Sequence, residues 1–167
     1  MAIAVFPGSF DPPTYGHLNV IERAAHLFER IDVVIAVNPE KSYTFSAEER
    51  LSLLSELTAP YRNVCVHQWG SLIVDYCRKV SANVLIRGVR NAHDFSYEFD
   101  LSLVNSSLDK DVQTLFLPTD QRYVLVRSSN IKELAKFGGD ISGMVPPSVE
   151  NALKARLSHG RGGPDMH

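Results

Sequence analysis

The stretch that decides the fold is AIAVFPGSFDPPTYGH, residues 2–17. Its first five residues form an apolar run that is typical of a strand buried on both faces of a sheet. Residues 17–28 then repeat apolar side chains at a spacing of three to four, which predicts an amphipathic helix. A strand, a tight turn and a helix in this order predict a β-α-β unit, with the turn at the carboxyl edge of a parallel sheet. In open parallel sheets, ligands bind at that edge.

The rest of the chain repeats the alternation of strand and helix. Further apolar runs, mostly continuous, lie at 31–37, 64–68, 84–88 and 112–118, and helical patterns lie at 46–57, 71–80, 93–108, 128–139 and 146–157. We therefore expect an α/β fold, a doubly wound five-stranded parallel sheet with helices on both faces. The last two helices follow the last strand and are expected to form a helical C-terminal cap.

Local signals predict where two of these helices begin and end. Ser46 and Glu49 stand at capping-box spacing, and so do Asn130 and Glu133. The pair of glycines at 138–139 is expected to stop the helix that begins near residue 128.

Length, composition and charge limit the possible classes of protein. The chain has 167 residues, 44% of them hydrophobic, which predicts one domain over residues 1–157 and a flexible glycine-rich tail at 158–167. A formal net charge of −2 gives no general reason to expect nucleic-acid or anionic-membrane binding. No apolar run reaches the roughly 20 residues of a membrane span. Cys65 and Cys77 fit no redox or zinc motif, so we expect reduced thiols in a cytoplasmic protein.

The turn after the first strand is suited to an anion. Gly8 can adopt backbone angles closed to other residues and lets a phosphate approach the main chain. Ser9 and Thr14 offer hydroxyl groups, His17 falls in the first turn of the helix, and the helix N-terminus offers unpaired N–H groups. Taken alone, His17 is more simply read as a surface histidine on an ordinary loop.

Three cations change that interpretation. Lys41 follows the second strand, and Arg87 and Arg90 close the fourth, so all three belong at the carboxyl edge beside His17. Each cation alone would be an ordinary solvated or ion-paired side chain. The sequence contains no P-loop, no GxGxxG after the first strand, no GxSxG and no metal-ligand cluster. We therefore predict phosphate chemistry without a covalent nucleophile.

At this point the sequence resembles a known family. FPGSFDPPTYGH looks like the T/HxGH signature of the nucleotidyltransferase superfamily, and residues 1 to about 157 are similar to the bacterial phosphopantetheine adenylyltransferases. Three further blocks carry the likeness: VNPEKSYTFSAEER, VLIRGVRNAHDFSYEFDLSLVN and RSSNIKEL. The resemblance implies a Rossmann-like nucleotidyltransferase fold. It also implies adenylyl transfer from ATP to 4′-phosphopantetheine, giving dephospho-coenzyme A and pyrophosphate, the penultimate step of coenzyme A biosynthesis.

The same resemblance implies Mg²⁺ as cofactor, a homohexamer, and coenzyme A as a product-like ligand or inhibitor. It assigns catalytic roles to His17, Lys41 and Arg90, with His17 as a hydrogen-bond donor that stabilises the transition state. For the phosphopantetheine substrate it implies contacts from Ser9, Lys41, Ile73 and Arg87. For ATP it implies contacts from Ser9, Phe10, His17, Gly88, Val89, Arg90, Glu98, Tyr123, Val124, Leu125, Val126, Arg127, Ser128 and Ser129.

One position departs from the family pattern. Arg127 stands where the family usually has the first of three serines, so it either adds a cation for the γ-phosphate or turns outward. We favour the outward orientation, with Ser128 and Ser129 left to bind phosphate. Two alternatives share the first motif, a nicotinate mononucleotide adenylyltransferase and a glycerol-3-phosphate cytidylyltransferase, and a third is a nucleotide-binding regulator without activity.

Overall fold

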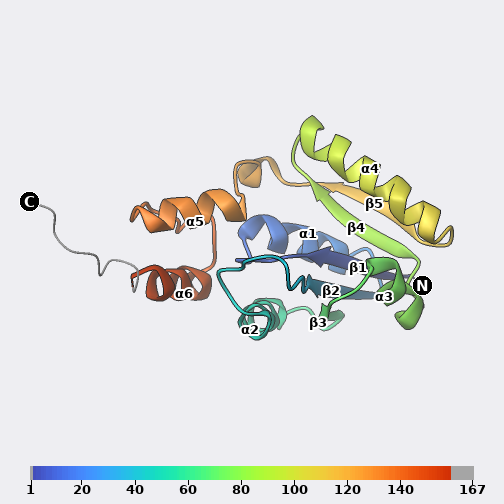
Figure 1. Ribbon diagram of the computed structural model, residues 1–167, viewed down its shortest axis with the longest axis horizontal. Coiled ribbons are helices and arrows are strands. Elements are labelled where there is room, and N and C mark those ends of the chain that lie inside the picture. Colours follow the sequence, from blue (N-terminus) through green and yellow to red (C-terminus); the bar gives the residue numbers. More distant parts are fainter. Residues whose placement is uncertain (1, 159–167) are drawn as a thin grey trace, which may run out of the picture.

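The computed structural model describes residues 2–158, and a five-stranded sheet forms its centre (Figure 1). All paired strands are parallel, and their order across the sheet is β3-β2-β1-β4-β5. This is the predicted doubly wound arrangement. The strands are β1 (Ile3–Gly8), β2 (Arg30–Ala36), β3 (Val64–Trp69), β4 (Val84–Val89) and β5 (Gln113–Pro118).

Position in the sheet decides how each strand is buried. In β2, residues 31–35 are all buried, because neighbouring strands and helices cover both faces. The edge strands β3 and β5 instead alternate between more and less exposed residues. The expectation of mostly continuous burial is therefore correct for the inner strands and wrong for the two edges.

Helices cover both faces of the sheet. The helices α1 (Tyr15–Ala25) and α2 (Ala47–Thr58) pack on one face, where Ile21 and Leu54 join the core. The helix α3 (Ile73–Val80) covers the other face and buries Tyr76 and Cys77. The predicted Ser46–Glu49 capping box begins α2, with both reciprocal hydrogen bonds present.

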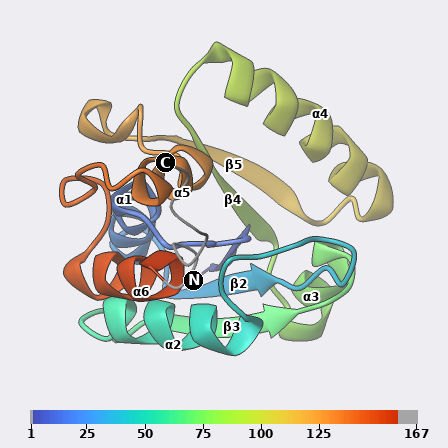
Figure 2. The ribbon, with the colours of Figure 1, turned by 60° about the vertical axis from the view of Figure 1, so that its left-hand side comes forward.

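The helix α4 (Ala92–Leu108) runs alongside β4 and β5, and its Phe95 meets Phe116 of β5 edge-on (Figure 2). None of its 17 residues is buried. Large apolar side chains along it remain exposed, namely Phe95, Tyr97, Phe99, Leu101, Leu103, Val104 and Leu108. An apolar surface of this extent on one helix is unusual for a surface that contacts only water.

The predicted C-terminal cap consists of α5 (Ser128–Lys136) and α6 (Pro147–Ser158), which follow the short 3-10 helix η1 (Gln121–Tyr123). The two helices share a third core that includes Ile131 and Leu153. The chain leaves α5 through Gly138, whose φ of 76° explains the glycine.

Two boundary predictions for this cap need correction. Asn130 is not an N-cap, because α5 already begins at Ser128 after Arg127, which makes no side-chain capping bond. The helix therefore starts without a capping box. Ser158 belongs to α6 rather than to a tail, and the rest of the predicted tail lies outside the described residues. No helix within residues 2–158 is long and apolar enough to cross a membrane.

Candidate active site at the carboxyl edge of the sheet

The turn after β1 is tied to α1 by a capping box. Thr14 is the N-cap, its hydroxyl accepts from the backbone N–H of His17 at 3.3 Å, and its own N–H donates to His17 Nδ1 at 3.1 Å. Thr14 is 1% exposed. Its hydroxyl therefore caps the N-terminus of α1, whereas the sequence analysis considered it as a hydrogen-bond donor to a ligand.

This capping box also sets the protonation of His17. A backbone N–H is always a donor, so Nδ1 must accept and the proton of the neutral ring lies on Nε2. Burial, as the larger cause, and the positive charge of Arg90 together lower the pKa of His17 to about 4. At neutral pH, His17 is thus an uncharged ring that donates from Nε2.

Gly8 is required for space and not for backbone freedom. Its φ is not in the left-handed region, contrary to the expectation, whereas Phe10 has a φ of 49°. A Cβ on Gly8 would lie 3.0 Å from two ring carbons of Phe10. The Phe10 ring in turn meets His17 edge-on, with the centroids 4.9 Å apart. Gly8 therefore leaves room for the aromatic ring on which His17 rests.

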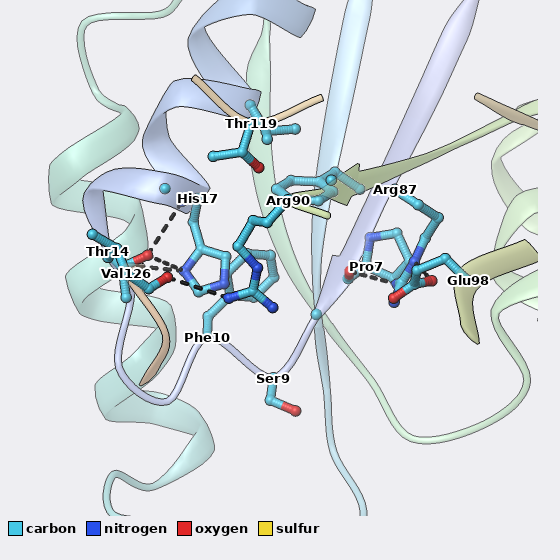
Figure 3. A pocket seen from close by; sticks show the side chains of 15 residues that line it. Pro7, Ser9, Phe10, Thr14, His17, Arg87, Arg90, Glu98, Thr119 and Val126 are labelled. Carbon is cyan, nitrogen blue, oxygen red and sulfur yellow. Dashed lines mark hydrogen bonds and ion pairs between the residues drawn. The ribbon is translucent and has the colours of Figure 1, made fainter. Parts of the chain in front are cut away.

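A cavity of about 240 Å³ opens beside His17 (Figure 3). Its lining includes Ser9 and Phe10 from the first turn, Gly88 and Arg90 from the end of β4, and Val126. The structure thus brings together residues that lie more than 100 positions apart, as the sheet topology predicted.

Two arginines on β4 and in the turn after it bring positive charge to this cavity, and each is held by a carboxylate. Arg87 donates to both oxygens of Glu98 at 2.6 Å and to the carbonyl of Pro7 at 3.0 Å. Arg90 donates from Nε to Asp94 at 2.7 Å and from Nη1 to the carbonyl of Val126 at 3.3 Å.

A second cavity, of about 460 Å³, adjoins the first. The two share Pro7, Gly8, Ser9, Arg87 and Glu98 in their linings. The second cavity extends under α4 and is lined there by apolar residues that include Leu72, Ile73, Leu101, Val104 and Leu108. The predicted substrate residue Ile73 therefore lies in a larger and more apolar space beside the shared Arg87.

Several predicted residues lie outside these two linings. Lys41 is exposed on the loop between β2 and α2. Tyr123 stacks on Tyr15 with the centroids 6.1 Å apart, and Ser128 donates to the carbonyl of Pro12 at 3.0 Å. Val89, Val124, Leu125 and Ser129 line neither cavity.

Arg127 contacts Asp94 rather than the cavity beside His17. Its guanidinium lies 3.5 Å from Asp94 Oδ1, and its side chain is 39% exposed. A neighbouring hollow contains Arg127, Asp94 and Arg90 in its lining. That hollow shares Gly88, Arg90 and Glu98 with the cavity beside His17, so the choice between the two orientations of Arg127 stays a prediction.

Two buried residues beside the site, Asp11 and Arg50, carry no signal in the sequence that would have identified them. Asp11, 4% exposed, accepts from the backbone N–H groups of Thr44 and Phe45 and pairs with Lys132 at 3.2 Å. Arg50, 1% exposed, donates to the carbonyl of Ser9 at 2.7 Å. A charged residue in an amphipathic helix such as α2 is normally expected on the exposed face, so the burial of Arg50 could not be predicted from the sequence.

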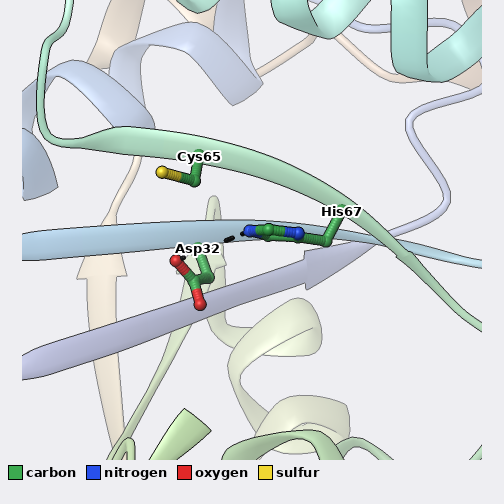
Figure 4. Close-up of side chains that lie close together, drawn as sticks. All are labelled: Asp32, Cys65 and His67. Carbon is green, nitrogen blue, oxygen red and sulfur yellow. Dashed lines mark ion pairs between the residues drawn. The ribbon is translucent and has the colours of Figure 1, made fainter.

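A separate cluster combines potential metal ligands on β2 and β3 (Figure 4). Asp32, Cys65 and His67 present ligand atoms within 4.8 Å of one another. Arg30, however, donates to both oxygens of Asp32 at 3.0 and 2.9 Å, and the hydroxyl of Tyr76 donates to one of them. A cation would have to displace the guanidinium, so Asp32 is better described as the centre of a buried ion pair.

The cavity beside His17 offers Mg²⁺ no free protein carboxylate. Glu98 is the carboxylate in its lining, and both its oxygens accept from Arg87. Mg²⁺ commonly binds substrate phosphates and retains several waters. This donor set fits an ion that arrives bound to a nucleotide and does not fit a resident site.

Comparisons with known proteins agree with this geometry. The sequence profile of the Cytidylyltransferase-like family matches residues 5–134. Phosphopantetheine adenylyltransferases from Desulfosudis oleivorans and Desulfatibacillum aliphaticivorans are each 46% identical, over 159 and 154 residues. The alignments cover 95% and 92% of this chain, and 95% and 88% of those proteins.

A solved structure from Vibrio parahaemolyticus, assigned as a nicotinate-nucleotide adenylyltransferase, shares the fold. Its TM-score is 0.71 at 20% identity, and the match covers 94% of this chain and 95% of that one. The matched profile and the two 46% identical relatives, together with the cavity around His17, show that the chain belongs to the cytidylyltransferase-like family and, within it, to the phosphopantetheine adenylyltransferases.

Proposed function

We propose that this chain transfers the adenylyl group of ATP to the phosphate of 4′-phosphopantetheine, forming dephospho-coenzyme A and pyrophosphate. The observation that carries the proposal is a neutral His17, with its Nε2–H free to donate, in the same cavity lining as Ser9, Arg87 and Arg90. This arrangement supports a reaction between two phosphates and provides no covalent nucleophile.

His17 acts as a hydrogen-bond donor to the α-phosphate. Its Nδ1 is occupied by Thr14 N–H, which fixes the ring and directs Nε2 away from the capping box. The acceptor phosphate is already ionised near neutral pH, so the reaction requires no general base to activate it. The donor bond from His17 strengthens as negative charge grows on the α-phosphate, which lowers the barrier.

The two adjoining cavities support an in-line arrangement of the substrates. ATP occupies the cavity beside His17, with Gly88, Val126 and Arg90 around the nucleotide. The pantetheine arm lies in the more apolar cavity along Ile73. The reacting phosphates meet at Ser9 and Arg87, which the two linings share. Holding two polyanions there against their repulsion is the main task of the protein.

The remaining predicted contacts complete this proposal. Lys41 closes over the phosphate of phosphopantetheine from its exposed loop, and the segment 123–129 covers the adenine and the phosphates. Mg²⁺ enters with ATP and neutralises charge on the phosphates that leave as pyrophosphate. The two cysteines are free thiols, as suits a cytoplasmic enzyme.

The experiment that tests the function is pyrophosphate release from ATP and Mg²⁺ with 4′-phosphopantetheine. Parallel reactions contain nicotinate mononucleotide with ATP, and glycerol-3-phosphate with CTP. Release with phosphopantetheine alone is the expected result. Release with either of the other acceptors alone would contradict the substrate assignment, and no release with any acceptor would support a regulator that binds nucleotide without turnover.

We further propose a homohexamer in which α4 contributes to the contacts between subunits. Its exposed apolar side chains, including Phe95, Phe99 and Leu103, support this assignment. Light scattering at micromolar concentration should give six times the chain mass. The double substitution F95E/L103E should lower that mass, and a monomeric wild-type chain would refute the assembly.

A further inference from the structure

Asp94 is the carboxylate that holds Arg90 at the cavity. It accepts the Nε–H of Arg90 at 2.7 Å, and its side chain is 14% exposed. The Nε–H of Arg90 donates to Asp94 and one N–H of Nη1 donates to the carbonyl of Val126, so the free end of the guanidinium consists of both Nη2 hydrogens and the second Nη1 hydrogen. The orientation of that free end is therefore set by Asp94 and Val126 together.

Asp94 is itself held firmly. It is the third residue of α4, where its backbone N–H donates to the side chain of Asn91, the N-cap, at 2.9 Å. A carboxylate in the first turn of a helix is favoured by the helix dipole. Its second oxygen faces the guanidinium of Arg127 at 3.5 Å. Contacts with two arginines and with the helix N-terminus thus hold the Asp94 side chain in place.

We propose that Asp94 is a positioning residue for adenylyl transfer, which acts by fixing the guanidinium of Arg90 beside His17. Arg90 and His17 line the same cavity, whereas Asp94 lines the neighbouring hollow and is not part of the lining of that cavity. The inference rests on the proposed function, since it assigns Arg90 to the phosphates of the nucleotide.

The positioning role predicts a particular kinetic pattern. Without Asp94, Arg90 keeps its charge but loses one of the two hydrogen bonds that orient it. Its contact with the transition state, which depends on orientation, should therefore weaken more than its general attraction for the bound substrates. We expect Asp94→Ala to lower kcat at least tenfold while the KM for 4′-phosphopantetheine stays within twofold. Asp94→Asn retains an oxygen acceptor of the same shape and should lose less.

A double-mutant cycle with Arg90→Ala separates positioning from a structural role. If Asp94 acts through Arg90, the double variant D94A/R90A should be no slower than R90A within twofold. Asp120→Asn is the matched control, because Asp120 also pairs with an arginine, Arg122, and lies outside the linings of the cavities described above. It should retain wild-type kcat.

Several results would overturn the proposal. The first is a double variant D94A/R90A whose loss of kcat equals the product of the two single losses. The second is an unchanged kcat in both D94A and D94N. The third is a loss of kcat in D120N as large as that in D94A. If D94A fails to fold, as its melting curve would report, D94N and the cycle D94N/R90A carry the same test. Turnover by the wild type tests the proposed function. The ratio of kcat between each variant and the wild type tests the role of Asp94. A failure of the proposed function can therefore be told apart from a failure of the role proposed for Asp94.

Discussion

Replacing His17 by glutamine should remove a specific loss of stability in acid. In the native chain the pKa of His17 is about 4, against an ordinary value of 6.5. Between those values the unfolded chain binds a proton on this ring that the native chain does not bind. Because the unfolded state then holds more protons, the free energy of unfolding falls as the pH drops through 6.5, and the loss is complete below about pH 4.

The size of the effect follows from the two pKa values. A difference of about 2.5 between them corresponds to about 3 kcal/mol once the pH is below both, and to about 2 kcal/mol at pH 5. Glutamine is the matched replacement, because it can make the same reciprocal capping bond to the Thr14 N–H without titrating.

Urea unfolding of the wild type and H17Q between pH 7.5 and 4.5 measures this contribution. The wild type should lose about 2 kcal/mol more than H17Q by pH 5, at unchanged m-values. Other groups titrate equally in both chains and cancel in the difference. Parallel stability curves for the two chains would refute a His17 ring that is partly buried and neutral, and with it the assignment of Nε2 as the donor.

Three further substitutions test the site. His17→Ala should lower kcat about 100-fold while raising the KM for ATP less than about fivefold, because the lost bond belongs to the transition state; equal losses in both would contradict that role. Lys41→Ala should raise the KM for 4′-phosphopantetheine about tenfold, the cost of one charge-assisted bond, and leave the KM for ATP unchanged; unchanged kinetics would remove Lys41 from the site. Gly8→Ala should destabilise the fold by about 1–3 kcal/mol, because its Cβ would press on Phe10 at 3.0 Å, whereas Gly143→Ala, with nothing within 4 Å, should melt like the wild type.

The apolar patterns of the sequence were sufficient to predict the fold. Every predicted strand and helix is present, and the strand order is that of a doubly wound sheet. The strands and helices depend on apolar spacings within about four positions, which the sequence shows directly. The strand order depends on the right-handed crossover, which nearly all β-α-β units follow. The Ser46–Glu49 capping box was likewise predictable, because both of its bonds are local.

Local signals failed where packing sets the backbone. Asn130 and Glu133 have the spacing of a capping box, yet α5 already begins at Ser128, whose hydroxyl donates to the carbonyl of Pro12 from the turn after β1. Gly8 was assigned for its backbone freedom, but what requires it is the ring of Phe10. In both cases a contact that the linear sequence does not record overrides the local preference.

The sequence by itself determined the elements, their order, and the edge of the sheet at which His17, Arg87 and Arg90 belong. Only the tertiary structure decided which groups hold them. The partners of Arg90 are Asp94, four residues away, and the carbonyl of Val126, 36 residues away. The physical reason is that the apolar pattern of a strand or helix depends on which of its own residues are buried, and this pattern is visible in each segment alone. Ion pairs and hydrogen bonds between segments depend instead on which segments the packed sheet places side by side.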